Sequence, residues 1–372
     1  MRFCQSFRDS TILQTCPDLQ VPPVPRYEPA PAAQEALDYA DLAIIDLRNF
    51  TTAEGRVRLV LQVREAMSNQ GFFYVIGHGY PREKMERMFD IANVPFTQVS
   101  EEEKEQYMAP TKHAGSYQGY KLRQFWHIDN GQVKIYNIHR DVNKRVHPEA
   151  LRPLLPESSQ FARHSHPNVL DPILRWDADS ETLIVGLLFS YLLDHNFTLV
   201  DFCSLVVGYM KYDLRSAEDE QKTKNVWLKG HNDIGTVTLL YNGVWKWIKH
   251  IDNAIVVNSG DAMDFLSGGG LYRATIHRVV QPPPDQHQYT RLGIFYFCMA
   301  DDNVKLAPLV ASPVLQRLGI ERRFERDEDA PVMAEWRKAR TAAYGRSNLS
   351  KSTEETDIEQ EVIQGVVVKH YN

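Results

Sequence analysis

The second half of the chain is a series of short runs rich in β-branched and aromatic residues, and this feature restricts the possible folds most. From about Ser204 onward, Gly, Asp, Asn or Pro separates most of these runs. Short strands at such spacing are typical of an antiparallel sandwich, barrel or jelly roll. The runs are LVVGYMKY, TVTLLY, WKWI, AIVVNSG, TIHRVV and RLGIFYF. We therefore predict a β-rich core in this part of the chain.

The first half mixes strand and helix patterns. Residues 41–47 predict a first strand, and residues 71–79 predict a buried strand that ends in a glycine turn. Apolar residues recur at helical spacing in 52–69, and Pro81 is expected to open a further helix. Apolar residues in 180–207 predict a long buried helix.

The C-terminal part returns to a helical pattern. Residues 330–344 predict a helix closed by Gly345, and the acidic segment 346–359 is expected to be mobile. The expected division of the chain is an extended lead-in over 1–40, an N-terminal helical and strand region over 41–204, a jelly-roll core over 205–305, and a C-terminal helical extension and tail over 306–372.

Composition excludes several classes of function. A formal charge of −6 over 372 residues provides neither a basic field for nucleic acid nor a polybasic patch for a membrane. No stretch approaches the roughly 18 apolar residues of a membrane helix, and the first residues do not resemble a signal peptide. The four cysteines are scattered, which favours reduced thiols. Reduced thiols favour a cytoplasmic location, and we expect a monomer or weak homodimer.

A His-x-Asp pair is a weak signal in a chain with 13 histidines, so its surroundings must decide. Non-haem iron oxygenases need two imidazoles and one carboxylate on one face of the metal. His231 and Asp233 lie between two glycines and directly before TVTLLY, so an extended backbone would point both side chains the same way. His277, in the run TIHRVV, would be the third ligand on a facing strand. This set is predicted to bind the metal.

Two other pairs have the same spacing but lack this context. The region after the first pair contains prolines and no alternating strand, and the second has a matching histidine only in a helical-looking region. For both, a surface or packing role is the better interpretation. The two pairs are His127 with Asp129 and His139 with Asp141.

From about Asp41 to the C-terminus, the chain resembles the isopenicillin N synthase-like branch of the 2-oxoglutarate/Fe(II) dioxygenases, especially fungal members of secondary metabolism. The motifs that carry this resemblance are DLAIIDL, GFFYVIGHG, KGHNDIGTVTLLY, VVNSGDAMDFLSGG, LYRATIHRVV, RLGIFYF, EWRKARTAAYG and VVVKHYN. It implies a mainly β fold with flanking helices, built on a double-stranded β-helix (jelly-roll or cupin-like) core. It also implies Fe(II) bound by His231, Asp233 and His277, with Arg291 pairing with the distal carboxylate of 2-oxoglutarate.

The chain departs from the family pattern at two places. Gly293 stands where the usual Arg-x-Ser motif has its serine, so one hydroxyl donor to 2-oxoglutarate is missing. Tyr212, in MKYD, replaces an Asn-x-Tyr-type motif; it is a candidate contact to the co-substrate, with core packing as the competing interpretation. Some members of this branch use no 2-oxoglutarate, so an iron-dependent oxidase of the same fold stays open as an alternative.

The resemblance implies oxidation of a small organic molecule with 2-oxoglutarate and O₂ through an Fe(IV)-oxo intermediate. Hydroxylation, desaturation and ring rearrangement all follow from this chemistry. A polyketide or tropolone precursor, a terpenoid or an alkaloid would suit the mixture of aromatic and basic residues expected around the pocket. Those residues are Tyr117, Tyr120, Lys121, Arg123, Trp126 and Trp336. Packing or surface exposure competes for each of them, and a catalytically silent cupin-like binding protein or an isomerase on the same site remains open.

Overall fold

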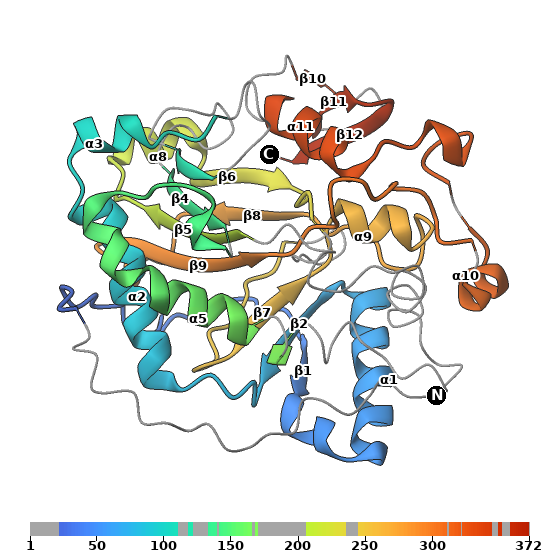
Figure 1. Cartoon of the computed structure of the whole chain (residues 1–372), viewed down its shortest axis with the longest axis horizontal. Helices are drawn as coiled ribbons and strands as arrows, with labels where there is room; N and C mark the ends of the chain where they lie inside the picture. Colours follow the sequence, from blue (N-terminus) through green and yellow to red (C-terminus); the bar gives the residue numbers. More distant parts are fainter. Residues whose placement is uncertain are drawn as a thin grey trace.

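The computed structural model shows sheets at the centre, with helices on both sides (Figure 1). The residues that it describes are 22–110, 118–121, 133–139, 141–165, 168–169, 206–235, 245–310, 312–320, 322–343, 349–351 and 358–371.

Within these residues the strands form three sheets. The first has the order β1 (Ala43–Asp46), β2 (Phe72–Ile76), β7 (Ile255–Asn258). The second is antiparallel, in the order β3 (Gly119–Lys121), β4 (Val133–His139), β5 (Val206–Tyr212), β9 (Arg291–Phe297). The third is also antiparallel, in the order β10 (Ser350–Lys351), β11 (Ile358–Ile363), β12 (Val366–Tyr371), β6 (Val226–His231), β8 (His277–Val280).

The α-helices lie mostly at the periphery. They are α1 (Ala53–Asn69), α2 (Arg82–Thr97), α3 (Glu101–Gln106), α5 (Leu155–Ser165), α8 (Ala217–Thr223), α9 (Asp261–Leu266), α10 (Pro313–Leu318) and α11 (Met333–Ala343). Short 3₁₀ helices are η1 (Leu47–Thr51), η2 (Val142–Lys144), η3 (Glu149–Leu154), η5 (Pro284–Gln286) and η6 (Asp327–Asp329).

The helix predicted over 52–69 is α1, and its start has a clear local cause. The hydroxyl of Thr52 accepts a hydrogen bond from the backbone N–H of Gly55 at 3.0 Å, which satisfies one of the free donors of the first turn. Leu59 and Val63 on its inner face then pack on β1 and β2 in the main hydrophobic core. The strands predicted over 41–47 and 71–79 are β1 and β2, so these predictions are confirmed.

The second and third sheets pack face to face. Ile135 on β4 and Tyr212 on β5 meet Trp227 and Leu228 on β6 in one apolar cluster, where the rings of Tyr212 and Trp227 are stacked with centroids 5.9 Å apart. The opposite face of the second sheet is covered by α2 and by the segment around α5. Side chains of β6, β8 and β9 therefore line a cavity beside this cluster.

The C-terminal end differs from its prediction. Within 346–359, for which the composition predicts mobility, Ser350 and Lys351 form β10, and Ile358 and Glu359 open β11. The β11–β12 hairpin continues the sheet of the metal-site strand, because Tyr371 pairs with Gly230 of β6. Apolar residues at alternate positions of 358–371 bury one face of this hairpin against α11 and the core, which explains the ordered end.

Other predictions are partly outside the described residues. The helix expected over 180–207 lies there except for its last two residues, which belong to β5 and are therefore extended. The run at 236–241 also lies outside. Residues 245–248 form no strand; Trp247 makes only an isolated bridge with Tyr39.

None of the helices in the described ranges has both the length and the apolar character needed to cross a membrane. Cys298, which lies in the described part of the chain, is a buried thiol.

Candidate functional site

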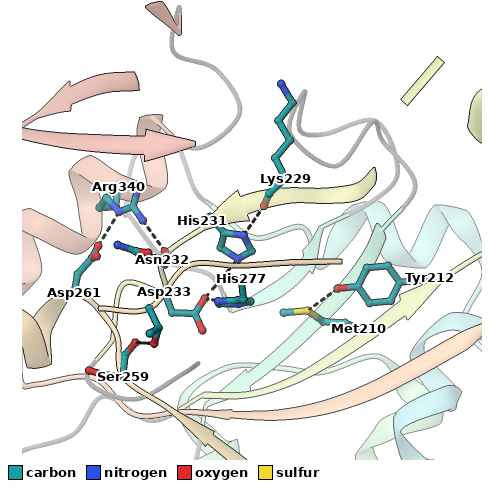
Figure 2. A network of polar contacts seen from close by, with 11 residues as sticks. Met210, Tyr212, Lys229, His231, Asn232, Asp233, Ser259, Asp261, His277 and Arg340 are labelled. Carbon is teal, nitrogen blue, oxygen red and sulfur yellow. Dashed lines mark hydrogen bonds and ion pairs between the residues drawn. The ribbon is translucent and has the colours of Figure 1, made fainter. Parts of the chain in front are cut away.

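The structure brings together the three side chains of the predicted metal set. His231 ends β6 and is paired directly with His277, which begins β8; their ring centroids are 4.4 Å apart. The Nε2 atom of each histidine lies 3.7 Å from Oδ1 of Asp233. All three ligand atoms lie within 4.8 Å of one another. Figure 2 shows the side chains of His231, Asp233 and His277 gathered at one place. Among the described residues this is the one such group of histidine, cysteine and acidic side chains.

One detail differs from the sequence argument. That argument requires an extended strand through Asp233, but β6 ends at His231, and Asp233 lies in the irregular segment just before the bend at Ile234 and Gly235. Strand alternation therefore does not by itself aim the carboxylate. Its direction depends on contacts that this segment makes with other parts of the chain.

The protonation of His231 suits a metal ligand. Its Nδ1 lies 2.8 Å from the carbonyl oxygen of Lys229, and because a carbonyl can only accept, Nδ1 must donate. The lone pair is then on Nε2, which faces Asp233 and His277. Burial, and next the neighbouring His277, hold the pKa of His231 well below its usual value. The imidazole is thus neutral near pH 7, as ligation requires.

The site also contains polar atoms that the described residues leave unsatisfied. Oδ2 of Asp233 and Nδ1 of His277 are buried and have no hydrogen-bond partner there. An unpaired buried carboxylate oxygen is costly unless a cation lies beside it. Two atoms that each lie about 2.1 Å from one metal ion can be at most about 4.2 Å apart, and the 3.7 Å separations meet this limit. The donor set therefore fits a single Fe(II) ion.

Backbone contacts hold the segment from Asp233 to the bend at Gly235. The carbonyl of Asp233 accepts a hydrogen bond from the N–H of Asp261 at 2.8 Å, and that of Gly235 accepts one from Ala262 at 3.0 Å. A Cβ on Gly260 would lie only 2.4 Å from the oxygen of Gly235, so a glycine is needed for this close approach. The segment from Asp233 to Gly235 is therefore hydrogen-bonded to the first residues of α9.

A cavity of about 1430 Å³ opens at the metal site. Besides the three ligand candidates it is lined by Lys121, Tyr212 and Arg291. Arg291 and Tyr212 face each other across β9 and β5, with the guanidinium carbon 5.5 Å from the centre of the tyrosine ring. Lys121 is only 6% exposed. A cavity that holds cationic side chains next to a metal site suits acidic ligands.

The structure gives a steric reason for the missing serine at Gly293. A Cβ at this position would lie 2.5 Å from Cε2 of Phe295, far inside van der Waals contact. Phe295 is itself stacked on Phe297, with ring centroids 5.8 Å apart and planes at 8°. Phe295 and Phe297 also line the cavity, so an aromatic surface stands where the family pattern has a hydroxyl.

The remaining predicted pocket residues divide into two groups. Tyr117, Arg123 and Trp126 lie outside the described residues. Tyr120 and Trp336 are described, but neither lines the cavity.

The prediction that Tyr120 and Trp336 contact the substrate is not retained. Tyr120 is buried on the helix-covered face of its sheet and donates to the carbonyl of Pro95 at 2.9 Å. Trp336 is fully buried and packs edge-to-face on Phe265. Successive residues of a strand point to opposite faces, so Lys121 reaches the cavity while Tyr120 cannot.

One competing His-x-Asp pair is a local turn. Nδ1 of His139 accepts a hydrogen bond from the N–H of Asp141 at 3.0 Å, and Asp141 in turn caps η2. His127 and Asp129 lie outside the described residues.

Sequence reasoning misses the roles of Asp261 and Phe295. Asp261 belongs to a motif that enters only through the resemblance, and no local pattern relates it to Asp233. The signal for Phe295 is its place two residues from the departure at Gly293, which puts it on the same face of the strand.

Comparison with known protein families agrees with this geometry. Residues 42–157 match the family described as the N-terminal region of non-haem dioxygenases in morphine synthesis. Residues 211–300, which contain the three ligand candidates and Arg291, match the 2OG-Fe(II) oxygenase superfamily. Together the two matches span more than half of the chain.

Individual relatives point to the same group. A 2-oxoglutarate-Fe(II) type oxidoreductase from Emericella nidulans is 26% identical over 267 residues, covering 64% of this chain and 74% of the relative. Gibberellin 2-beta-dioxygenase 7 from Arabidopsis thaliana is also 26% identical over 267 residues, covering 69% and 74%.

Solved structures share the fold. A full-length Neurospora crassa protein, crystallised in complex with alpha-KG and 5-formyluracil, aligns with a TM-score of 0.63 at 19% identity, covering 83% of this chain and 99% of that one. A putative 2OG-Fe(II) oxygenase family protein from Caulobacter crescentus aligns with a TM-score of 0.60 at 17% identity, covering 80% and 96%. The chain therefore belongs to the 2-oxoglutarate/Fe(II) oxygenases and is a non-haem dioxygenase that uses Fe(II) and 2-oxoglutarate.

Proposed function

We propose that the protein oxidises a small secondary metabolite, by hydroxylation, desaturation or oxidative ring rearrangement, at an iron ion bound by His231, Asp233 and His277. The observation that carries this proposal is the convergence of the three ligand atoms within 4.8 Å at the wall of a large cavity. When bound there, Fe(II) would supply O₂ activation coupled to decarboxylation of 2-oxoglutarate. The protein supplies position, charge and a space from which water is excluded.

Arg291 is proposed to bind the distal carboxylate of 2-oxoglutarate. A guanidinium can donate two parallel hydrogen bonds to a carboxylate, which fixes both the position and the orientation of the co-substrate. Tyr212 supports it from the paired position on β5, where its ring lies below the guanidinium. Because Gly293 offers no hydroxyl, Arg291 carries more of this recognition than it would beside a serine.

Lys121 is proposed to contact the organic substrate. Through Ile135 it lies in the same cross-strand row as Met210 and Gly293, so it faces the cavity from the far edge of the sheet that carries Arg291. A buried ammonium there would pair with an acidic or oxygenated group of the substrate. With the aromatic surface of Phe295 and Phe297, this favours a flat, oxygenated molecule such as a polyketide or tropolone precursor, a terpenoid or an alkaloid.

The fold is proposed to be a double-stranded β-helix whose core spans 205–305. The face-to-face packing of the second and third sheets supports this, as does the likeness to solved 2-oxoglutarate oxygenases. We further propose a cytoplasmic monomer or weak homodimer.

The first experiment is an anaerobic titration of the metal-free protein with Fe(II) and 2-oxoglutarate. A visible charge-transfer band at one iron per chain is expected in the wild type and absent in His277→Ala. His250→Ala is the matched control, because His250 also lines the cavity but lies outside the ligand group. A folded wild type that takes up no iron would contradict the proposal and favour a silent binding protein.

The second experiment screens aromatic, terpenoid and alkaloid compounds for O₂-dependent mass changes. Succinate should form in proportion to substrate turnover. An oxidised product without succinate would instead indicate an oxidase that takes all its electrons from the substrate.

A further inference from the structure

Arg340 is a buried arginine on the C-terminal helix α11 that reaches the segment carrying the metal ligands. It is 1% exposed, and its Nη2 donates to the carbonyl oxygen of Asn232 at 2.8 Å. Asn232 is the residue between the two ligands His231 and Asp233, and Figure 2 shows the guanidinium directly above it. The helix is more than 100 residues away in sequence, yet it contacts the backbone between two of the ligand candidates.

The same guanidinium also contacts α9. Its Nε lies 3.2 Å from Oδ2 of Asp261, the residue whose N–H donates to the carbonyl of Asp233. The carbonyls of Asn232, Asp233 and Gly235 therefore each accept a hydrogen bond from outside their own segment. Arg340 donates the hydrogen bond to the carbonyl of Asn232, the residue next to His231. Its ion pair with Asp261 links it to the residue that donates the hydrogen bond to the Asp233 carbonyl.

The energetics of Arg340 do not suggest a residue kept for stability alone. Burying a guanidinium and a carboxylate costs free energy, and an apolar pair of similar volume often serves as well or better. Burial raises the pKa of Asp261, and the positive charge of Arg340 lowers it again only in part, so the pKa stays raised. Nε and Nη1 of Arg340 are buried without a hydrogen-bond partner among the described residues, so the contact with Asp261 is an ion pair and not a hydrogen bond. Such an arrangement is better explained by the geometry that it imposes.

The helix that carries Arg340 is firmly seated. Trp336, one turn earlier, is fully buried and meets Phe265 of α9 edge-to-face with ring centroids 5.1 Å apart. The N–H of Met333 donates to the carbonyl of Val304 at 2.8 Å. The guanidinium is thus projected from a rigid element, which is needed to hold a ligand segment accurately.

We propose that Arg340 is a positioning residue of the metal centre. It holds the Asn232 carbonyl, and through Asp261 the Asp233 carbonyl, so that the side chains of His231 and Asp233 keep the separation that iron needs. This role compensates for the end of β6 at His231, after which no strand directs the carboxylate. The inference rests on the proposed iron ligands and makes α11 part of the iron site.

The test compares metal binding in Arg340→Met and Arg340→Lys with that in Arg337→Met. Arg337 lies one turn earlier on α11 and pairs with Asp302 at 2.7 Å, away from the ligand segment. Fe(II) affinity is measured anaerobically by the charge-transfer band with 2-oxoglutarate. Arg340→Met is expected to bind iron about ten- to a hundredfold more weakly, the usual effect of losing a group that orients a ligand. Arg340→Lys should have an intermediate Fe(II) affinity, because it keeps the positive charge but loses the paired N–H donors of the guanidinium. The affinity of Arg337→Met should stay within about twofold of wild type.

A second readout separates positioning from loss of stability. The visible spectrum of bound Co(II), a probe of ligand geometry, should change in Arg340→Met and stay unchanged in Arg337→Met, while melting of the metal-free protein records general destabilisation. An Arg340→Met protein with wild-type iron affinity and an unchanged Co(II) spectrum would overturn the inference. Equal losses of affinity in the Arg340→Met and Arg337→Met proteins would do so too, because the effect would then belong to the helix as a whole.

If Arg340→Met does not fold, Fe(II) affinity is measured in Arg340→Lys and Asp261→Asn instead. Wild-type affinity in both of these variants would refute the positioning role of Arg340. A wild type that binds no Fe(II) would instead count against the proposed function, whereas a normal wild type with unaffected variants counts only against the role of Arg340.

Discussion

Introducing a serine at Gly293 would test whether sterics explain the absent hydroxyl. The substitution restores the group that the family pattern places two residues after Arg291. In this chain, the new Cβ would lie 2.5 Å from Cε2 and 2.9 Å from Cζ of Phe295. Since carbon atoms normally rest about 3.5–4.0 Å apart, the ring must retreat by about 1 Å.

The cost of that retreat can be worked from the neighbours of the ring. Phe295 is stacked on Phe297, and Phe297 in turn occupies the space over Gly208, where a Cβ would lie 2.8 Å from its Cε2. Movement of one ring therefore disturbs both. We expect Gly293→Ser to lower the free energy of unfolding by about 1–3 kcal/mol, the usual cost of overpacking. A serine in a strand recovers less than about 1 kcal/mol of backbone entropy relative to glycine.

The assay is a double-mutant cycle by urea unfolding of wild type, Gly293→Ser, Phe295→Ala and the double variant. Removing the ring removes the clash, so Gly293→Ser should be close to neutral in the Phe295→Ala background, with a coupling of at least about 1 kcal/mol. In that background the hydroxyl can also donate to the carboxylate that Arg291 is proposed to bind, which should tighten 2-oxoglutarate binding about threefold to tenfold. Additive effects within about 0.5 kcal/mol would refute the steric explanation.

Single residues give three further predictions. Arg291→Lys should raise the KM for 2-oxoglutarate about tenfold or more, because one point charge replaces a bidentate donor; unchanged steady-state succinate kinetics would contradict its role. Trp336→Ala should lower the free energy of unfolding by about 3–5 kcal/mol, as expected for a fully buried aromatic. A selective loss of substrate affinity without destabilisation would instead indicate that Trp336 contacts the substrate. Burial raises the pKa of Asp264 to about 6, and the nearby Arg323 only partly opposes this. The folded state thus binds this proton more readily than the unfolded chain, so the stabilisation is complete below about pH 4 and is lost as pH rises through 6. Urea unfolding at several pH values should show Asp264→Asn gaining stability relative to wild type over that window, and a constant difference would show that the carboxyl has no raised pKa.

Local signals predicted the elements that have local causes. Thr52, whose hydroxyl caps the first turn, starts α1, Pro81 precedes α2, and the apolar run over 71–79 becomes β2. Alternation within TIHRVV and RLGIFYF located the strands of His277 and Arg291. These predictions succeeded because capping, ring constraints and side-chain periodicity act within a few residues.

The prediction of a mobile segment over 346–359 is contradicted at the residues described there, in β10 and at the start of β11, for the opposite reason. The segment 346–359 is polar and acidic, yet parts of it belong to β10 and β11, because pairing extends the sheet of β6. Trp336 illustrates the same limit, since a tryptophan on an amphipathic helix looks alike whether it faces a cavity or a core. Only the position of α9 decides between the two.

The chemistry of the site was therefore determined by the sequence alone: which residues can bind iron, which arginine can bind a carboxylate, and that a serine is missing. Tertiary structure decided how these groups are aimed. Asp233 lies beyond the end of its strand, and its backbone is held by α9 and by Arg340, both distant in sequence. Contacts between distant segments produce no repeating pattern in the sequence. The local sequence of each segment is compatible with many tertiary arrangements, and only packing selects one of them.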